Sequence, residues 1–517
     1  MGERVNSDTK PNAGIVSGIR LLEPARLAEN SLRAASALND VGVWQGDVVA
    51  LLMRNDFAYF EATAGAMRLG ASTVPLNWHL KPDELAYILD DCSAKVLIAH
   101  TDLLTEDVLA ICSDVEVIAV RTPQEVASAY GVDAARLDLK IPVAEWDRWI
   151  RDYPPWTEQA RRVTGPMFYT SGTTGRPKGV KRKPVLPEVA QRAEARSGFA
   201  FGMSAGPVRS VMTGPLYHSA PNAYGMRVVM DGGLLVLQPR FDAVELLSLV
   251  EEYRITHLHM VPTMFVRLLA LPGEIKQAYD LSSLRHVVHG AAPCPPEVKR
   301  AMIEWWGPVI HEYYALTETG IITSSDSQGW LDHPGSVGCP VPGIEILILD
   351  DENRRCDVGT AGEICVKSEV TSKVTYHRAS DNTESMRRGD YVATGDVGYL
   401  DDDGYLYISD RKSDMVISGG VNIYPAEVEN TLVTMSGVRD CAVFGLPDKE
   451  FGERLVAVVD APNGLSKEKV KEFLREKIAA YKVPREIFFS ADLPREDSGK
   501  IKKRLLRDRL LGGGTLS

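Results

Sequence analysis

The sequence lacks three features that would place the chain outside the cell or in a membrane. It has no CxxC pair, and its seven scattered cysteines disfavour a disulfide framework or a zinc site and favour a reducing compartment. It has no apolar segment near the N-terminus, so no secretory signal is predicted. No apolar run approaches the roughly 20 residues that span a bilayer. We therefore expect a cytoplasmic protein with no integral membrane association.

Basic residues are also in deficit. The 58 lysines and arginines are outnumbered by 70 aspartates and glutamates, which gives a formal net charge of −12. This excess repels nucleic acid over most of the surface, so no nucleic-acid partner is predicted, although a nucleotide in a local pocket remains compatible. The remaining composition, 44% apolar and 25% charged, is typical of a globular protein, and 517 residues are enough for at least two cores.

Helix-like and strand-like stretches alternate through the first part of the chain. Residues 26–41 carry apolar side chains at helical spacing, and residues 46–53 have the pattern of a buried strand after a turn. The same alternation recurs at residues 60–77 and 84–100. Repeated units of this kind predict an α/β protein of layered sheets with helices packed on them.

The pattern changes near residue 410. Downstream, strand-like segments at 439–446 and 453–461 precede a helix that Ser466 is placed to cap. About 100 residues are enough for a small independent domain, so we place a boundary at Ser413. The predicted units are a large N-terminal domain, residues 1–412, and a small α+β C-terminal domain, residues 413–517.

The segment Tyr169–Val180, YTSGTTGRPKGV, is the most informative part of the sequence. A strand-like stretch runs into a loop of glycines and hydroxyl side chains that ends at Lys178, and a second strand-like stretch follows. Such a loop can turn backbone N–H groups toward an anion, with Lys178 adding positive charge. It is not a Walker A loop, because Lys178 follows a proline instead of the second glycine. Its residues alone fit both a polyphosphate cradle and a flexible surface loop.

TSGTTGRPKG resembles the signature loop of the adenylate-forming superfamily of acyl-CoA synthetases, luciferases and peptide-synthetase adenylation domains. Four further segments resemble that family's motifs, in the family's order: YALTE at 314–318, TGD at 394–396, DR at 410–411 followed by ISGGVNIYPAEVE, and LPREDSGKIKKRLL at 493–506. The sequence departs from the family pattern at Ala315, where glycine is usual, and at the hinge residue Ser413, where aspartate or lysine is common.

The resemblance implies a large N-terminal domain, a mobile C-terminal domain, and the use of ATP, Mg²⁺ and coenzyme A. Catalytic roles fall to Lys500, Thr317 and His218, and the metal ligand is Glu318. The residues implied in binding nucleotide or coenzyme A are Thr170, Ser171, Gly172, Thr173, Thr174, Gly175, Lys178, Gly290, Ala291, Ala292, Tyr314, Thr317, Asp396, Arg411, Gly419 and Gly420.

Each implied role also has a plainer structural alternative. Tyr314 has a flat ring that can stack on adenine, or it can be a core tyrosine. Glu318 is a hard oxygen ligand suited to Mg²⁺, or a solvated surface acid. Asp396 can accept hydrogen bonds from ribose hydroxyls, or it can be a turn aspartate. His218 lines the carboxylate end of the acyl site or is a packed histidine. Lys500 bridges the acyl carboxylate and the α-phosphate, or belongs to a solvated basic face.

The resemblance predicts a two-step reaction in which a carboxylate attacks ATP to form acyl-AMP, and the thiol of coenzyme A then takes the acyl group. The candidate pocket segments, residues 211–225 and 319–325, contain no charged side chain, which favours a medium- or long-chain or otherwise bulky hydrophobic acid. A hydroxycinnamate-like aryl acid is the alternative substrate. Alternative functions are a stand-alone adenylation enzyme that loads a carrier protein, a luciferase-type oxygenase and a nucleotide-binding regulator without turnover. The sequence leaves open whether the protein is a monomer or a homodimer.

Overall fold

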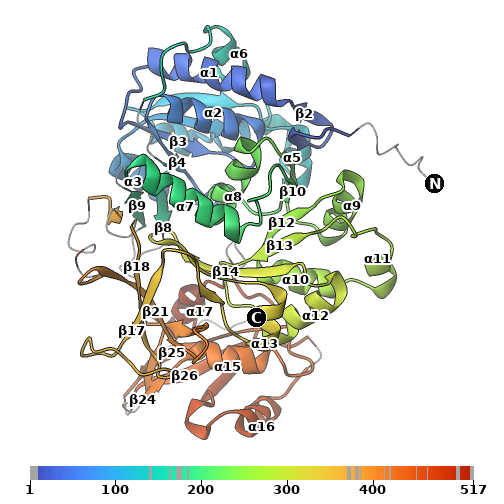
Figure 1. Cartoon of the computed structure of the whole chain (residues 1–517), viewed down its shortest axis with the longest axis vertical. Helices are drawn as coiled ribbons and strands as arrows, with labels where there is room; N and C mark the ends of the chain where they lie inside the picture. The colour runs from blue at the N-terminus through green and yellow to red at the C-terminus, as the bar shows by residue number, and fades with distance from the viewer. Residues whose placement is uncertain are drawn as a thin grey trace.

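The computed structural model describes most of the chain (Figure 1). The described residues are 10–138, 142–161, 165–170, 177–182, 185–369, 374–378, 384, 386–412, 414–418, 421–449, 451–462, 464–495 and 501–512. They form an α/β structure with a large N-terminal part and a smaller C-terminal part, as the sequence predicts. Figure 1 shows β25, β26, α15 and α16 at the opposite end of the molecule from α1 and α2.

A nine-stranded sheet forms the centre of the N-terminal part, in the order β16-β15-β14-β13-β12-β10-β11-β1-β2. Its strands are β1 (Gly14–Ser17), β2 (Arg20–Leu22), β10 (Arg209–Met212), β11 (Leu234–Leu237), β12 (His257–Met260), β13 (His286–His289), β14 (Ile310–Leu316), β15 (Gly320–Ser325) and β16 (Cys339–Pro340). The inner strands are parallel, whereas β2, β15 and β16 join antiparallel at the two edges. The carboxyl ends of β12, β13 and β14 therefore meet along one edge of the sheet.

Both faces of this sheet are covered, as a parallel sheet requires. One face packs in an apolar core with residues of α1 (Pro24–Asp40), α2 (Phe57–Arg68) and α8 (Ser219–Met230). The other face packs against α9 (Ala243–Tyr253), α10 (Pro262–Leu269) and α12 (Pro296–Trp306). The strands at this centre are short runs of buried residues, and they hold the loops that follow them in fixed positions.

A second, fully parallel sheet has the order β4-β3-β5-β6-β7. Its strands are β3 (Val48–Leu52), β4 (Ser72–Pro75), β5 (Ala94–His100), β6 (Glu116–Val120) and β7 (Ala144–Glu145). The helix α3 (Pro82–Cys92) packs on it in a third core. The predicted helix at 26–41 and strand at 46–53 correspond to α1 and β3, so the predicted alternation is confirmed.

Two smaller sheets complete the N-terminal part. The first pairs β8 (Phe168–Thr170), β9 (Lys178–Arg182) and β19 (Val374–Tyr376). The second contains β17 (Glu345–Leu349), β18 (Gly362–Lys367), β20 (Arg387–Arg388), β21 (Tyr391–Leu400) and β22 (Leu406–Arg411). The turn between β21 and β22 falls on the sequence DDDG at residues 401–404.

The C-terminal part has its own sheet and its own apolar core. The sheet contains β23 (Val416–Ser418), β24 (Val421–Ile423), β25 (Asp440–Asp448), β26 (Gly452–Asp460) and β27 (Glu486–Phe489), with helices α15 (Pro425–Leu432), α16 (Lys467–Lys477) and α17 (Lys503–Leu511). The side chain of Ser466 accepts a hydrogen bond from the backbone N–H of Lys469, so the predicted helix cap is confirmed. Within the described part of the chain, no helix combines the length and apolar character that crossing a membrane requires.

Candidate active site

The YALTE segment lies where β14 ends and turns into β15. The pairing of the two strands shifts register between Tyr314 and Ala315, which bends the strand just before the turn. In the turn, the Thr317 hydroxyl lies 3.1 Å from the hydroxyl of Ser219, the first residue of α8. The turn therefore contacts the segment that contains His218, and two motifs about 100 residues apart in sequence meet.

Tyr314, Asp396 and Arg411 form a connected polar group that joins the nine-stranded sheet to β21 and β22. The Tyr314 hydroxyl donates a 2.5 Å hydrogen bond to Asp396 Oδ2, and Arg411 Nε lies 3.2 Å from Asp396 Oδ1. The second contact follows from strand register, because Asp396 on β21 pairs directly with Arg411 on β22. Three residues expected to bind one nucleotide are thus joined through Asp396.

Burial and charge determine the ionisation of this group. Burial, together with the Asp396 carboxylate, raises the pKa of the Tyr314 hydroxyl well above its usual range, so Tyr314 is a neutral donor. Burial lowers the pKa of Arg411, but Asp396 and other acidic neighbours, among them Glu318, leave it raised. Glu318 thus belongs to the same electrostatic environment. We call Tyr314, Glu318, Asp396 and Arg411 the nucleotide side of the site.

The segment Gly290–Ala292 follows β13 and lies against β14. A Cβ atom at Gly290 would stand 2.8 Å from the ring of Tyr313 and 2.9 Å from its carbonyl oxygen, so only glycine fits there. Ala291 is exposed and has a φ of 68°, a left-handed conformation that a non-glycine residue adopts at an energetic cost. The close approach fixes the start of this segment against Tyr313, the residue before Tyr314 on β14.

His218 is half-buried at the start of α8, and its ring centroid lies 4.4 Å from that of Tyr217. Neutral hydrogen bonds hold the preceding residues in place. Asn55 bonds to the backbone of Gly214 and Leu216, and the Tyr59 hydroxyl donates to the Leu216 carbonyl. We call residues 213–218 the acyl-side loop. Its backbone is fixed without a charged side chain.

The structure does not test several predicted residues. Thr170 ends β8, and Lys178 begins β9 directly opposite it, so both predicted strands at the phosphate loop are present. The loop residues between them, Ser171, Gly172, Thr173, Thr174 and Gly175, lie outside the described residues, as do Ser413, Gly419, Gly420 and Lys500. Their roles remain predictions.

Two polar contacts were not expected from the sequence. The family pattern marks His218 and leaves Ser219 unmarked, although a hydroxyl at the start of a helix is a recognisable signal. His259 Nε2 lies 2.7 Å from the Tyr313 hydroxyl, and both residues are buried among Phe201 and Tyr224. No sequence pattern marks that pair, because its members lie on different strands.

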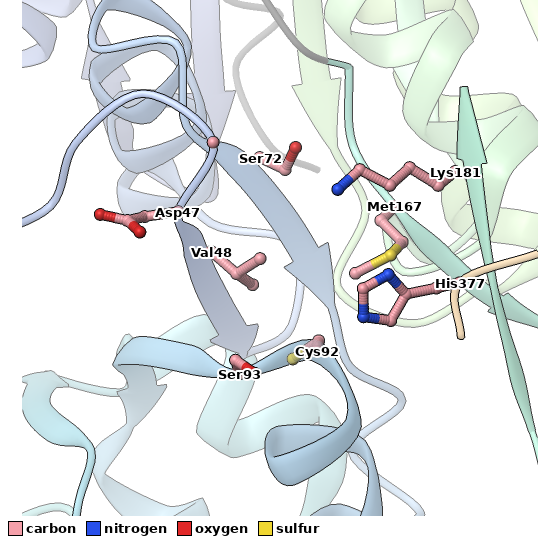
Figure 2. A pocket seen from close by; sticks show the side chains of 9 residues that line it. Asp47, Val48, Ser72, Cys92, Ser93, Met167, Lys181 and His377 are labelled. Carbon is pink, nitrogen blue, oxygen red and sulfur yellow. The ribbon is translucent and has the colours of Figure 1, made fainter. Parts of the chain in front are cut away.

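A separate cavity of about 180 Å³ lies where β3 and β4 begin, and Figure 2 shows Lys181 and His377 facing it from the β9 side. Its other lining residues are Gly46, Asp47, Val48, Ser72, Cys92, Ser93 and Met167. None of these is a predicted site residue. The cavity is smaller than the roughly 300 Å³ at which ligand pockets usually begin, so we do not place a substrate there.

The folded chain and its polar site together define an adenylate-forming enzyme. Residues 9–375 match the AMP-binding enzyme family, and residues 427–500 match the C-terminal domain of AMP-binding enzymes. The chain therefore belongs to the AMP-binding enzyme family.

Proteins of known name agree with this assignment. A feruloyl-CoA synthase from Amycolatopsis is 34% identical over 492 residues, covering 94% of this chain and 93% of that protein. A long-chain-fatty-acid–CoA ligase from Mycobacterium tuberculosis is 32% identical over 489 residues, covering 92% and 91%. The structure of O-succinylbenzoate coenzyme A synthetase from Bacillus subtilis with AMP has a TM-score of 0.81 at 27% identity, covering 98% and 96%. The predicted class, an AMP-forming acid–CoA ligase, is confirmed.

Proposed function

We propose that the enzyme activates a bulky hydrophobic carboxylic acid, of medium or long chain length or of comparable size, as acyl-AMP and transfers it to coenzyme A. The observation that carries this proposal is the contrast between the two sides of the site. Tyr314, Asp396 and Arg411 offer hydrogen bonds and charge to a nucleotide, whereas the acyl-side loop contains no charged residue.

The nucleotide side suits a ribonucleotide. The Tyr314 ring supplies a flat surface for the base, and its hydroxyl holds the Asp396 carboxylate, which would accept hydrogen bonds from the sugar. Asp396 is 4% exposed and already bonds to Tyr314 and Arg411, so its orientation is set before a ligand arrives. A pre-oriented group loses less freedom on binding and therefore contributes more to affinity.

Glu318 would help to hold Mg²⁺ together with the nucleotide. Among the described residues, no group of three or more histidine, cysteine, aspartate or glutamate side chains stands ready to hold a metal ion. Glu318 supplies one hard carboxylate in the turn after β14, and Mg²⁺ accepts such a small protein contribution when phosphate oxygens and waters complete its octahedron. When bound, the metal would neutralise charge on the phosphates. The single carboxylate therefore suits a Mg²⁺ ion that binds together with the nucleotide and not before it.

We assign the chemical steps to residues of both predicted domains. Lys500 would stabilise the charge that develops as the carboxylate attacks the α-phosphorus, with Thr317 and the loop from Thr170 to Lys178 holding the phosphates. The C-terminal domain would then rotate about Ser413 and bring Gly419 and Gly420 to line the path of the coenzyme A thiol. The described sheets divide at this point, since β22 ends at Arg411 and β23 begins at Val416.

The hydrophobic acid follows from the cost of burying unpaired charge. A second carboxylate or an ammonium group on the substrate would need a charged partner, and neither residues 211–225 nor residues 319–325 supplies one. An aryl acid is the second candidate, since the feruloyl-CoA synthase is as similar to this chain as the fatty-acid ligase is.

The deciding experiment is pyrophosphate release with a panel of acids and ATP, followed by thioester formation with coenzyme A. The panel should contain saturated acids of increasing length, hydroxycinnamates, and dicarboxylates as the charged control. We expect the highest kcat/KM for a bulky monocarboxylic acid. A preference for dicarboxylates would refute the hydrophobic assignment, and acyl-AMP that transfers only to a carrier protein would refute coenzyme A as the acceptor.

The proposed pivot has its own test. Proline fixes φ near −65° and restricts the residue before it, so Ser413→Pro should hold the C-terminal domain in one pose. We expect adenylation to continue while thioester formation collapses, measured on protein whose thermal unfolding matches the parent. Parental rates in both half-reactions would show that the domain boundary lies elsewhere.

A further inference from the structure

A lysine on α12, a glutamate on β14 and a histidine on β13 are buried together, close in sequence to Tyr314 of the nucleotide side. Lys299 is 0% exposed, and its ammonium donates a 2.6 Å hydrogen bond to Glu312 Oε2. His289, also 0% exposed, has its Nε2 atom 3.8 Å from the same carboxylate oxygen. We call Lys299, Glu312 and His289 the Lys299 cluster. It combines three ionisable groups in the interior of the protein.

The surroundings of the cluster are apolar. Lys299 comes from α12, and its ammonium lies 4.9 Å from the ring centroid of Trp330. His289 packs edge-on against Phe265, with 5.2 Å between the ring centroids. Removing an ion pair from water is costly, and apolar side chains of similar volume often give equal or greater stability. Stability alone therefore gives no reason for charge at this place.

The histidine adds a second anomaly. Neither ring nitrogen of His289 has a hydrogen-bond partner among the described residues. Burial, with the positive charge of Lys299, lowers the pKa of His289 well below its usual range, so the ring is neutral. Buried polar groups without partners are rare, and they gather where a structure serves a function besides its own stability.

The cluster lies between two segments with predicted nucleotide-binding residues, Gly290–Ala292 and the end of β14 with Tyr314. His289 pairs with Glu312 across β13 and β14, at the carboxyl edge of the sheet. The residue after His289 is Gly290, which begins the strained Gly290–Ala292 segment. Glu312 and Tyr314 are two residues apart on β14 and therefore point to the same face of the sheet. The ion pair thus ties α12 to β14, and the backbone pairing of His289 with Glu312 joins β13 to the same place.

We propose that the Lys299 cluster is a positioning device for the nucleotide base. The Lys299–Glu312 pair holds α12 against β14, next to its partner strand β13, and so sets the position of Tyr314 relative to the Gly290–Ala292 segment. The three side chains act through those segments and make no contact with the substrate. This inference rests on the proposed nucleotide site.

The test replaces the pair with apolar residues of similar volume, Lys299→Met/Glu312→Leu. We expect an unfolding midpoint close to that of the parent, a KM for ATP raised about tenfold, and kcat and the KM for coenzyme A within about twofold of the parent. Equilibrium binding of AMP, which requires no turnover, should weaken by the same factor as the KM for ATP rises.

The matched control is a second buried ion pair, Arg54–Asp102, whose residues follow the carboxyl ends of β3 and β5. Its double variant Arg54→Met/Asp102→Leu should leave the KM for ATP unchanged. A parental KM for ATP and parental AMP affinity in the Lys299→Met/Glu312→Leu variant would overturn the proposal. Equal changes in every kinetic constant, in both double variants, would also overturn it, because they would show a general structural role.

A third variant covers the case in which the double variant does not fold. Glu312→Gln keeps the shape of the side chain and removes its charge, and it should raise the KM for ATP selectively. Parental values would overturn the proposal here as well. If the parental enzyme itself neither exchanges pyrophosphate nor binds AMP, the proposed function fails, and with it the base site that the cluster would position.

Discussion

The nucleotide side and the acyl-side loop are held in place by different means. On the nucleotide side, a carboxylate, a guanidinium and a neutral phenol contact one another, and Asp396 forms the centre of the group. Around the acyl-side loop, Asn55, Tyr59 and Asn222 fix the backbone with neutral hydrogen bonds. Charge is therefore present where we propose that the nucleotide binds, and it is absent where we propose that the apolar acid binds.

The difference has a physical reason. A phosphate ester is strongly hydrated, and only charged or multiple hydrogen-bonding partners can replace its water. An apolar acid offers no such bonds, so a buried charge beside it would remain unpaired and costly. Both sides need a rigid backbone, and each obtains it with the kind of bond that its substrate tolerates.

The largest expected effect is the loss of acyl-AMP formation in a Lys500 variant, a change in the chemical step and not in binding on either side of the site. Lys500→Ala should reduce acyl-AMP formation about hundredfold to thousandfold, because a single positioned charge is lost from the transition state. Transfer from synthetic acyl-AMP to coenzyme A should continue near the parental rate. Both half-reactions are to be measured on the same preparation. Equal losses in the two assays would give Lys500 a structural role.

The next largest effect is expected for a substitution of Asp396, the central residue of the nucleotide side. Asp396→Asn keeps the shape of the side chain but removes the charge that faces Arg411. We expect the KM for ATP to rise about tenfold, corresponding to roughly 1.4 kcal/mol, with little change in the KM for the acid. Steady-state kinetics with each substrate varied in turn will show this. A rise in the KM for the acid alone would remove Asp396 from the nucleotide side.

The corresponding change on the acyl side should affect stability and leave nucleotide affinity intact. Tyr59→Phe removes a buried hydroxyl that donates to the Leu216 carbonyl and accepts a 2.6 Å bond from Asn222. Leaving these groups without their partner should lower the free energy of unfolding by about 1–2 kcal/mol. Denaturant unfolding measures the loss, and the KM for ATP should stay at the parental value. A selective change in the KM for ATP would contradict the separation of the two sides.

The smallest effect concerns pH at the junction with the C-terminal part. Burial raises the pKa of the Asp410 carboxyl from 3.8 to about 6, although Lys503 opposes the shift. The folded state thus binds this proton more tightly than the unfolded state does. The resulting stabilisation is fully present below pH 3.8 and is lost as the pH rises through about 6.

Asp410→Asn removes this dependence. Relative to the variant, the parent should gain roughly 1 kcal/mol of unfolding free energy as the pH falls from about 8 to about 5. Urea titrations of both proteins across that range provide the comparison, with the exposed Asp403→Asn as a control for the loss of one carboxylate. A difference that is independent of pH would show that Asp410 does not titrate in this window.

The sequence predicts the local elements of the site better than it predicts the side-chain contacts between separate elements. The strands on either side of the phosphate loop and the Ser466 cap both occur where the local sequence pattern places them. The contacts of Ser219 with Thr317 and of Tyr313 with His259 were not anticipated. Each joins residues from separate elements, and a hydroxyl or an imidazole has many possible partners in an unfolded chain.

The sequence by itself determined the α/β class, the order of the elements and the enzyme family, because helical and strand periodicity and the motif residues are local properties of the chain. Only the tertiary structure decided that Tyr314 reaches Asp396 across 82 residues and that Lys299 meets Glu312 in an apolar core. Those contacts depend on strand register and on the packing of α12 against β14. Register and packing arise from the simultaneous burial of distant apolar surfaces, which no short segment specifies alone.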